Sequence, residues 1–163
     1  MASLKYGCIT PNAKGRTYPV AASQYFPHAS GGFVYLDGSG HATMALTATA
    51  TLFGYAEAPA GRGAGSSDSW WLSSATAGAD KVHVITDLSA MFCVPATTTV
   101  TAAMAGNAAD IIGVNDGTVQ QADTDTSTTD VLLVQGVATD FISGAAATDA
   151  IVKINPAKIQ ADT

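Results

Sequence analysis

The sequence is poor in charged residues, and glutamate is almost absent. Only 12% of its 163 residues are charged, about half the usual share. Of the thirteen carboxylates, twelve are aspartate and one, Glu57, is glutamate. Glutamate, lysine and arginine suit exposed helix positions, whereas aspartate and threonine favour turns and strands. The composition therefore predicts little helix.

Basic residues are equally scarce. Seven lysines and arginines are scattered singly through a chain of net charge −6, so no run of them could neutralise a track of phosphates. We expect no direct binding to nucleic acid. Residues 1–6 lack the basic start and apolar run of a secretion signal, and no stretch approaches ~18 consecutive apolar residues. We expect no membrane partner and a protein that stays in the cytosol until it joins an assembly.

Cysteine and histidine are too sparse and too widely spaced to indicate a metal centre. Cys8 and Cys93 are the only cysteines; a disulfide between them remains open, although two free thiols are favoured in a reducing cytosol. His28, His41 and His83 lie far apart, and none stands at ligand spacing from another histidine or a cysteine. We predict no metal site.

Three short motifs resemble functional sites, but each lacks a required residue. The glycine-rich segment 61–65 has no lysine followed by serine or threonine, as a phosphate-binding loop requires. Segment 37–41 holds aspartate, serine and histidine, but on one local turn that does not suit a catalytic triad. Segment 123–127 begins like a calcium loop, yet Thr128 and Val134 replace its glycine and glutamate, so a polar turn is favoured over calcium. We expect no catalytic residue and no cofactor.

Small residues and turns dominate what is present. The chain has 31 alanines, 20 threonines and 16 glycines, and short strand-like segments recur about every ten residues between turns. This pattern predicts an all-β fold, either a β-barrel or a β-tulip or sandwich, in a chain long enough to bury a sizeable core. The expected strands are 32–36, 41–55, 81–85, 91–94, 98–104, a hairpin at 111–121, 131–137 and 150–154.

The first thirty residues differ from the rest. Residues 1–30 contain three prolines and no lasting periodicity, which predicts an extended N-terminal arm, followed by a single β-domain at residues 31–163. Lys5, Lys14 and Arg16 make this arm basic while the remainder is acidic. Two interpretations stay open: an arm laid on a neighbouring acidic surface, or an ordered leader that packs on its own domain.

Aromatic and basic residues on segments that are unlike regular strands are candidate contacts with other chains. Adjacent residues of a strand point to opposite faces, so either Trp70 or Trp71 is expected to face away from the core. The glycine-rich loop that precedes these two residues is included as well. Aromatic anchors often serve interfaces, although they equally pin loops to their own domain. The candidate interface residues are Lys5, Lys14, Arg16, Tyr25, Phe26, Arg62, Trp70 and Trp71.

Four segments resemble small structural proteins that coat the capsids of tailed bacteriophages. They are 82–87 (VHVITD), 91–94 (MFCV), 106–111 (GNAADI) and 151–156 (IVKINP). The resemblance implies a β-barrel or β-tulip, frequently trimeric, that binds the outside of a shell with the HK97-type fold and cements adjoining capsomers. It implies the major capsid protein as partner and the virion surface as location, after synthesis in the host cytoplasm.

Other functions remain open. The chain could be another virion component, such as a tail-tube subunit, a head-fibre base or a minor shell protein. It could also be a carbohydrate-binding adhesive domain that uses Tyr25, Trp70 and Trp71 as a stacking platform. An enzyme is the least favoured class, because no catalytic site is visible.

Overall fold

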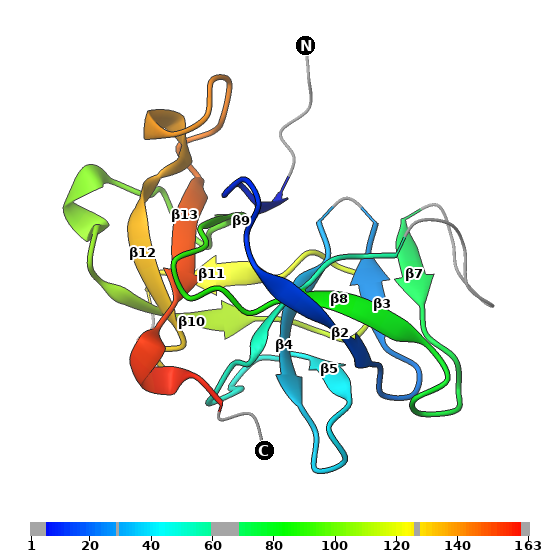
Figure 1. Ribbon diagram of the computed structural model, residues 1–163. Coiled ribbons are helices and arrows are strands. Elements are labelled where there is room, and N and C mark those ends of the chain that lie inside the picture. Colours follow the sequence, from blue (N-terminus) through cyan, green and yellow to red (C-terminus); the bar gives the residue numbers. More distant parts are fainter. Residues whose placement is uncertain (1–5, 29, 60–68, 126–127, 161–163) are drawn as a thin grey trace.

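The computed structural model describes residues 6–28, 30–59, 69–125 and 128–160. Within these residues the fold is all-β and sandwich-like, with three antiparallel sheets and no closed barrel (Figure 1). Helical structure in the described part is limited to the short 3₁₀ turns η1 (Ala102–Met104), η2 (Ala138–Asp140) and η3 (Pro156–Lys158). The predicted all-β class with little helix is confirmed.

Within the residues that the structure describes, thirteen strands form three sheets. A six-stranded sheet has the order β1-β9-β13-β12-β10-β11, a five-stranded sheet the order β2-β8-β6-β4-β5, and β3 pairs with β7. The strands are β1 (Gly7–Cys8), β2 (Gly15–Pro19), β3 (Tyr25–Pro27), β4 (Gly32–Leu36), β5 (Ala42–Met44), β6 (Gly54–Ala56), β7 (Trp70–Leu72), β8 (Lys81–Ile85), β9 (Phe92–Pro95), β10 (Ala108–Ile112), β11 (Gln121–Asp123), β12 (Leu132–Val137) and β13 (Asp149–Ile154).

The five-stranded sheet lies between two hydrophobic cores because its strands are apolar on both faces. On β4, Phe33 belongs to the core shared with the six-stranded sheet and its neighbour Val34 to the opposite core. We call these the inner core and the outer core. Phe33, Tyr55 and Phe92 form the aromatic centre of the inner core, with ring centroids 4.6 to 5.2 Å apart. Phe26 and Trp71, from β3 and β7, cover the outer core.

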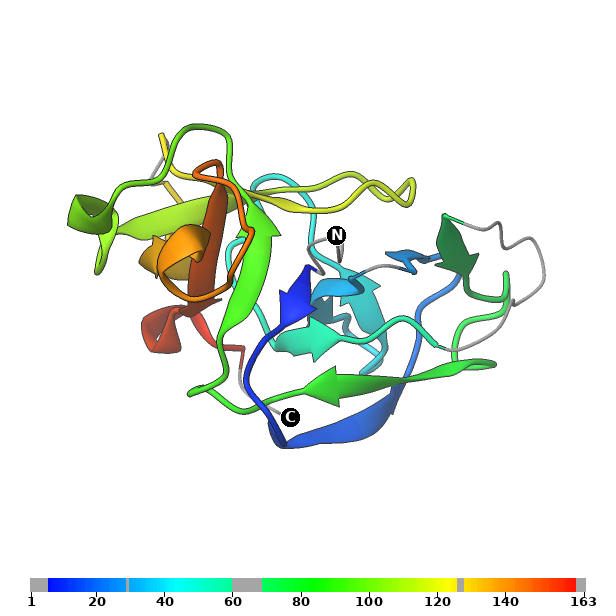
Figure 2. The ribbon, with the colours of Figure 1, turned by 90° about the horizontal axis from the view of Figure 1, so that it is seen from above.

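The β10–β11 hairpin extends away from its own sheet toward the β3–β7 pair (Figure 2). At its tip, Asn115 accepts a hydrogen bond from the Tyr25 N–H (2.9 Å) and donates one to the Ser23 carbonyl (3.0 Å). Gly117, at φ +88°, lies so close to Trp70 that a Cβ there would be 2.9 Å from the indole. The hairpin therefore fastens the outer layer to the six-stranded sheet.

Most strands lie where the sequence predicted them, and two expectations are wrong. β4 and β8 match 32–36 and 81–85, whereas the expected strand 41–55 ends at Met44 and resumes only at Gly54. Between these points Ala48 has φ +71° and Thr47 forms hydrogen bonds with Gly113, just after β10. The expected strand 98–104 is a loop that ends in η1. In both segments small residues mimic strand alternation although few are buried.

Residues 6–28 are extended and pack on their own chain. β1 joins β9, β2 joins β8 and β3 joins β7, so this segment contributes a strand to every sheet. Val20 and Phe26 are fully buried. Of the two interpretations of this segment, the structure therefore describes the ordered leader. Removing residues 2–30 would take strands from all three sheets and cannot leave the β-domain intact.

Two glutamine side chains form hydrogen bonds with the backbone of β4, and nothing in the sequence predicts these contacts. The Gln120 side chain accepts from the Phe33 N–H (2.6 Å) and donates to the Phe33 and Ala45 carbonyls. Gln160 makes the same pair of bonds with Leu36, each 2.7 Å long. Each amide thus completes the hydrogen bonding of β4 where no neighbouring strand reaches it.

Candidate interaction surface

Two of the predicted basic contacts lie on the edge strand of the five-stranded sheet. Lys14 and Arg16 are exposed, the first just before β2 and the second within it. Among the described strands β2 pairs with β8 alone and is an edge strand of its sheet. Lys5 and Arg62 lie outside the described residues. The described cations therefore remain available to a partner along one edge.

The predicted aromatic contacts separate into two pairs. Phe26 is fully buried and Trp71 is 5% exposed, and both pack in the outer core, so they are core residues and not surface anchors. This corrects their place in the candidate interface. β-strand alternation explains it: Trp71 faces inward, while Trp70 and Tyr25 are half-buried, with ring centroids 5.9 Å apart.

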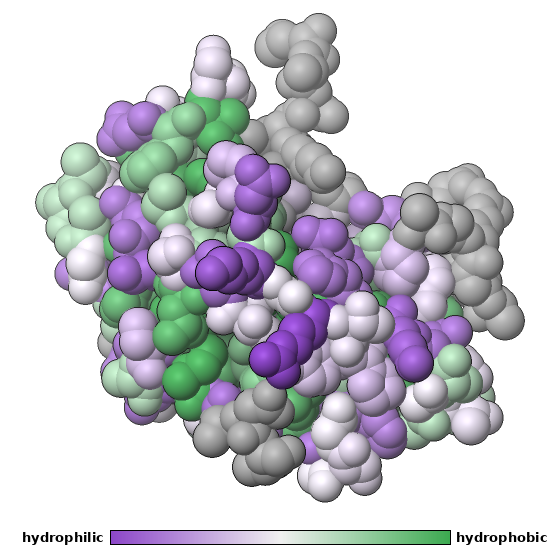
Figure 3. All heavy atoms as spheres, viewed as in Figure 1, coloured by the Kyte–Doolittle hydropathy of each residue, from purple (hydrophilic) through white to green (hydrophobic). Residues whose placement is uncertain are grey.

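Large apolar side chains are exposed on four separate connections, none of which the sequence singled out. Leu46 (39% exposed), Leu88 (40%), Val114 (60%) and Phe141 (45%) follow β5, β8, β10 and η2 respectively. Figure 3 shows apolar surface gathered over the part that contains β12 and β13, with polar residues over β2 and β8. No composition signal distinguishes these four from apolar residues of the core, because their loops are defined only by the tertiary structure.

Two grooves accompany these residues. One, of about 410 Å³, lies along residues 46–51 beside Tyr35. Its wall alternates threonine with alanine, so it offers hydroxyl groups and small apolar contacts. The other, of about 210 Å³, lies between β2 and the C-terminal segment and is called here the β2 groove. It is lined by Arg16, Tyr18, Phe53, Thr86, Leu88, Ile159 and Gln160.

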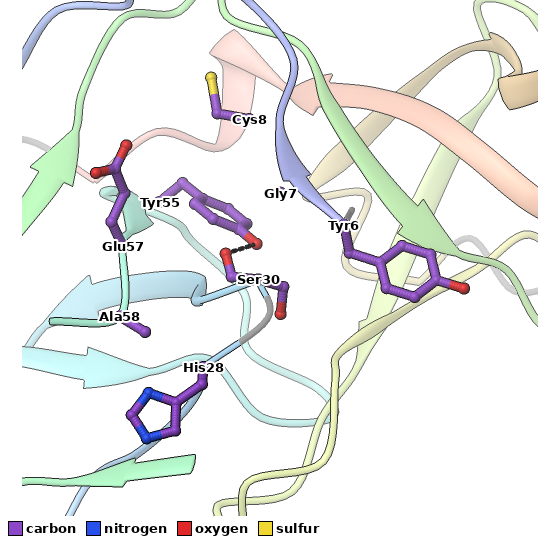
Figure 4. Close-up of a pocket in the computed structure, with 8 residues that line it drawn as sticks. All are labelled: Tyr6, Gly7, Cys8, His28, Ser30, Tyr55, Glu57 and Ala58. Carbon is purple, nitrogen blue, oxygen red and sulfur yellow. Dashed lines mark hydrogen bonds between the residues drawn. The ribbon is translucent and has the colours of Figure 1, made fainter. Parts of the chain in front are cut away.

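A third hollow, of about 180 Å³, lies where β1 meets the ends of β3 and β6 (Figure 4). The Tyr55 hydroxyl donates to the Ser30 carbonyl at 2.7 Å, and the Tyr6 side chain points away from it, toward Asp149. Burial raises the pKa of both the Tyr55 phenol and the Cys8 thiol above their ordinary values. Both groups are therefore protonated at neutral pH, which does not suit a nucleophile.

The two cysteines are close in register but face different ways. In the β1–β9 pair, Gly7 is opposite Cys93 and Cys8 is opposite Phe92. Neighbouring positions on a strand point to opposite faces, and accordingly Cys8 packs on the inner core and Cys93 on a third cluster outside the six-stranded sheet. Both are free thiols, and a disulfide would require the backbone to move.

The acidic segment that begins at Asp123 is organised by local hydrogen bonds. Asp123 accepts from the N–H of Asp125 (3.2 Å), and the Asp110 carboxylate accepts from the N–H groups of Thr128, Thr129 and Asp130 at 2.8 to 3.0 Å. Within the described residues, no three histidine, cysteine or acidic side chains are grouped to hold a metal ion. No helix in the same residues is long and apolar enough to cross a membrane.

Comparison with protein-family models, with curated proteins and with solved structures finds no match for this chain. Segments 82–87, 91–94, 106–111 and 151–156 fall largely on β8, β9, β10 and β13. Their shared pattern is therefore that of strands in two packed sheets.

Proposed function

We propose that the chain is a non-enzymatic virion structural protein that binds the outside of an HK97-type capsid and cements adjoining capsomers. Its partners are the major capsid protein and further copies of itself, in a homotrimer. The proposal combines the resemblance of roughly residues 80–155 to capsid-coating proteins with the surface of the fold. It needs no cofactor.

The observation that carries this proposal is the distribution of exposed apolar side chains. Leu46, Leu88, Val114 and Phe141 project from four different connections in both halves of the chain. Single exposed apolar residues are ordinary on protein surfaces; what supports the proposal is that these four lie on separate connections and so offer contacts to several neighbours. A protein that cements a lattice must touch several neighbours at once, and each contact then needs only modest affinity because many copies act together.

A second candidate, the carbohydrate-binding adhesive domain, is less well supported. Its stacking platform was to consist of Tyr25, Trp70 and Trp71, but Trp71 is buried in the outer core. The remaining two rings meet at 63° and therefore present no common flat face. A glycan array with the wild-type protein and a Trp70→Ala variant tests this candidate directly.

The capsid proposal is tested by adding the purified protein to undecorated HK97-type shells from several tailed phages. Co-sedimentation measures binding, and cryo-electron microscopy locates the protein. We expect saturable binding on the outer surface at capsomer junctions of at least one shell, and release of packaged DNA at a higher temperature when the protein is bound.

Phe141→Asp and Thr139→Asp provide a matched pair of variants. Both positions are exposed on the same connection, so both add one charge there, but only the first removes an apolar contact. We expect Phe141→Asp to lower occupancy more than Thr139→Asp. Density in the tail or at a fibre base would favour another virion role, and absence of binding to every shell would remove the capsid proposal.

A further inference from the structure

Charge is divided unevenly between two sides of the molecule. No lysine or arginine occurs between Lys81 and Lys153, a stretch that holds eight aspartates. Three of the five described lysines and arginines, Lys14, Arg16 and Lys81, lie on or beside β2 and β8. Figure 2 shows these strands on the opposite side of the molecule from the β10–β11 hairpin. One side is therefore relatively basic and the other acidic.

Two carboxylates beside the basic strands, Asp80 and Asp87, are held by local hydrogen bonds and keep their negative charge. Asp80 accepts from the Ser74 N–H at 2.6 Å, and Asp87 accepts from the N–H and hydroxyl of Ser89 at 3.0 and 2.6 Å. Arg16 has no ion pair within 4.0 Å among the described residues. Arg16 is exposed and lines the β2 groove, so it can meet an incoming carboxylate there.

The acidic side presents an apolar knob on a fixed support. Val114 is 60% exposed, the largest fraction among the exposed large apolar residues. The next residue, Asn115, is held by two hydrogen bonds to the β3 region, and Gly117 packs against Trp70. Asp116, between them, is exposed. The valine and the carboxylate are therefore held in place before any partner binds, which lowers the entropic cost of association.

The β2 groove has complementary properties. Tyr18 and Phe53 form an edge-to-face pair in it, with ring centroids 5.0 Å apart, and Leu88 on its wall is 40% exposed. Its volume of about 210 Å³ accommodates a short branched side chain. It is thus a recess of mixed polarity with apolar side chains and one cation in its lining, opposite in charge to the hairpin tip.

We propose that Val114 of one copy inserts into the β2 groove of a second copy, with Asp116 of the first facing Arg16 of the second. Because knob and groove lie on different sides of the molecule, each copy engages two neighbours. The contact is heterologous, and it closes into a ring or continues as a chain. The inference specifies the self-association included in the proposed function, and it holds with or without a capsid partner.

The first measurement is sedimentation velocity of the purified full chain from ~10 μM to ~1 mM at low and at physiological salt. We expect reversible association that weakens as salt is added. Val114→Asp and Leu88→Asp should each weaken it at least ~10-fold, because each places an unpaired carboxylate in an apolar contact. Phe141→Asp is the matched control, since Phe141 is similarly exposed (45%) but follows η2 and belongs neither to the hairpin nor to the β2 groove; it should leave association unchanged. Leu46→Asp, which lies beside the base of the hairpin at Gly113, tests the groove along residues 46–51 instead.

The decisive experiment mixes the two defective variants. Val114→Asp protein keeps an intact groove and Leu88→Asp protein keeps an intact knob, so together they retain one functional contact. We expect neither to associate alone and their mixture to form 1:1 dimers and nothing larger. Circular dichroism and thermal unfolding of each variant establish that it is folded; Val114→Ser and Leu88→Ser replace any variant that is not.

A wild-type protein that remains monomeric throughout this range overturns the inference, as does a mixture of folded variants that stays monomeric. Association that Leu46→Asp abolishes and Val114→Asp spares also overturns it, because the groove along residues 46–51 would then be the contact. None of these results bears on shell binding, which is measured separately on capsids.

Discussion

The inner and outer cores are similar in aromatic content but are built differently. The inner core lies under long strands, with six residues each in β12 and β13 and a ladder from β9 through β13 to β12 that one register shift, between Val134 and Gly136, interrupts. The outer core is covered by β3 and β7, which have only three residues each. The outer layer therefore depends on side chains and hairpin contacts for the cohesion that backbone ladders give the inner core. We expect it to open first under stress.

Truncation of one aromatic residue in each core tests this difference and has the largest expected effect. Phe92→Ala and Phe26→Ala both remove fully buried rings, and each should lower the free energy of unfolding by about 3 to 5 kcal/mol. For Phe92→Ala the whole chain should lose stability together. For Phe26→Ala, hydrogen exchange should accelerate in β3 and β7 before it does so in β12 and β13.

Chemical denaturation followed by amide exchange measures both effects. Uniform acceleration of exchange in both variants would mean that the two layers unfold as one unit. In that case the inner and outer cores would not differ in local stability.

The second test concerns Gln120, which fastens β4 to the segment before β11. Gln120→Leu leaves the Phe33 N–H buried without its 2.6 Å partner, so the free energy of unfolding should fall by about 1 to 3 kcal/mol. Gln121→Leu is the matched control, because its side chain is exposed and the change should be close to neutral. Equal losses in the two variants would show that the buried amide bonds contribute nothing specific.

How far the sequence predicted this architecture depends on the kind of residue involved. The bounds of β8 are predictable because the polar residues Lys81 and His83 alternate with Val82 and Val84, which differ strongly from them in hydrophobicity. The structure exposes the first two and buries the valines. The segment 41–55 misled because alanine and threonine alternate there, and either residue is tolerated on both faces of a strand. Hydrophobic period is informative only when the alternating residues differ strongly in transfer free energy.

The surface was less predictable than the fold. Phe26 and Trp71 were expected at an interface and are core residues, because the strands that bury them have only three residues each and leave no periodic signal. Leu88 and Val114 could not be recognised as exposed, since that depends on which loops the sheets leave uncovered. The roles of Gln120 and Gln160 depend on backbone brought close by tertiary structure, which composition does not encode.

A third, smaller effect should appear in acid. Although partial burial alone would raise the pKa of Asp110, hydrogen bonds from the N–H groups of Asp130, Thr128 and Thr129 lower it below its ordinary value. The carboxylate then stabilises the folded state fully above the ordinary aspartate pKa of about 3.9, and this contribution is lost as the pH falls through the lower folded value. At neutral pH, Asp110→Asn should cost about 1 to 2 kcal/mol.

Urea unfolding of wild type and Asp110→Asn between neutral and acid pH checks this expectation, with Asp125→Asn as the control for an exposed carboxylate. The gap between wild type and Asp110→Asn should narrow at the acid end. A gap that is constant with pH would mean that the three backbone bonds do not distinguish the charged carboxylate from an amide.

The last prediction is that a reducing agent does not change the unfolding temperature. It concerns how β1 is attached to the six-stranded sheet. β1 is only two residues long. A disulfide between Cys8 and Cys93 would attach it covalently to β9. Because these side chains face opposite sides of the sheet, we expect no disulfide between them. A reducing agent should therefore leave the unfolding temperature unchanged. Both thiols should react with a thiol reagent when the protein is unfolded without reductant. Cys93, whose pKa is raised to about 11 by burial and by Asp149, should react slowly in the folded protein. An intact mass that is lower by two hydrogens before reduction than after it would contradict this expectation, because it would show that a disulfide joins the two cysteines.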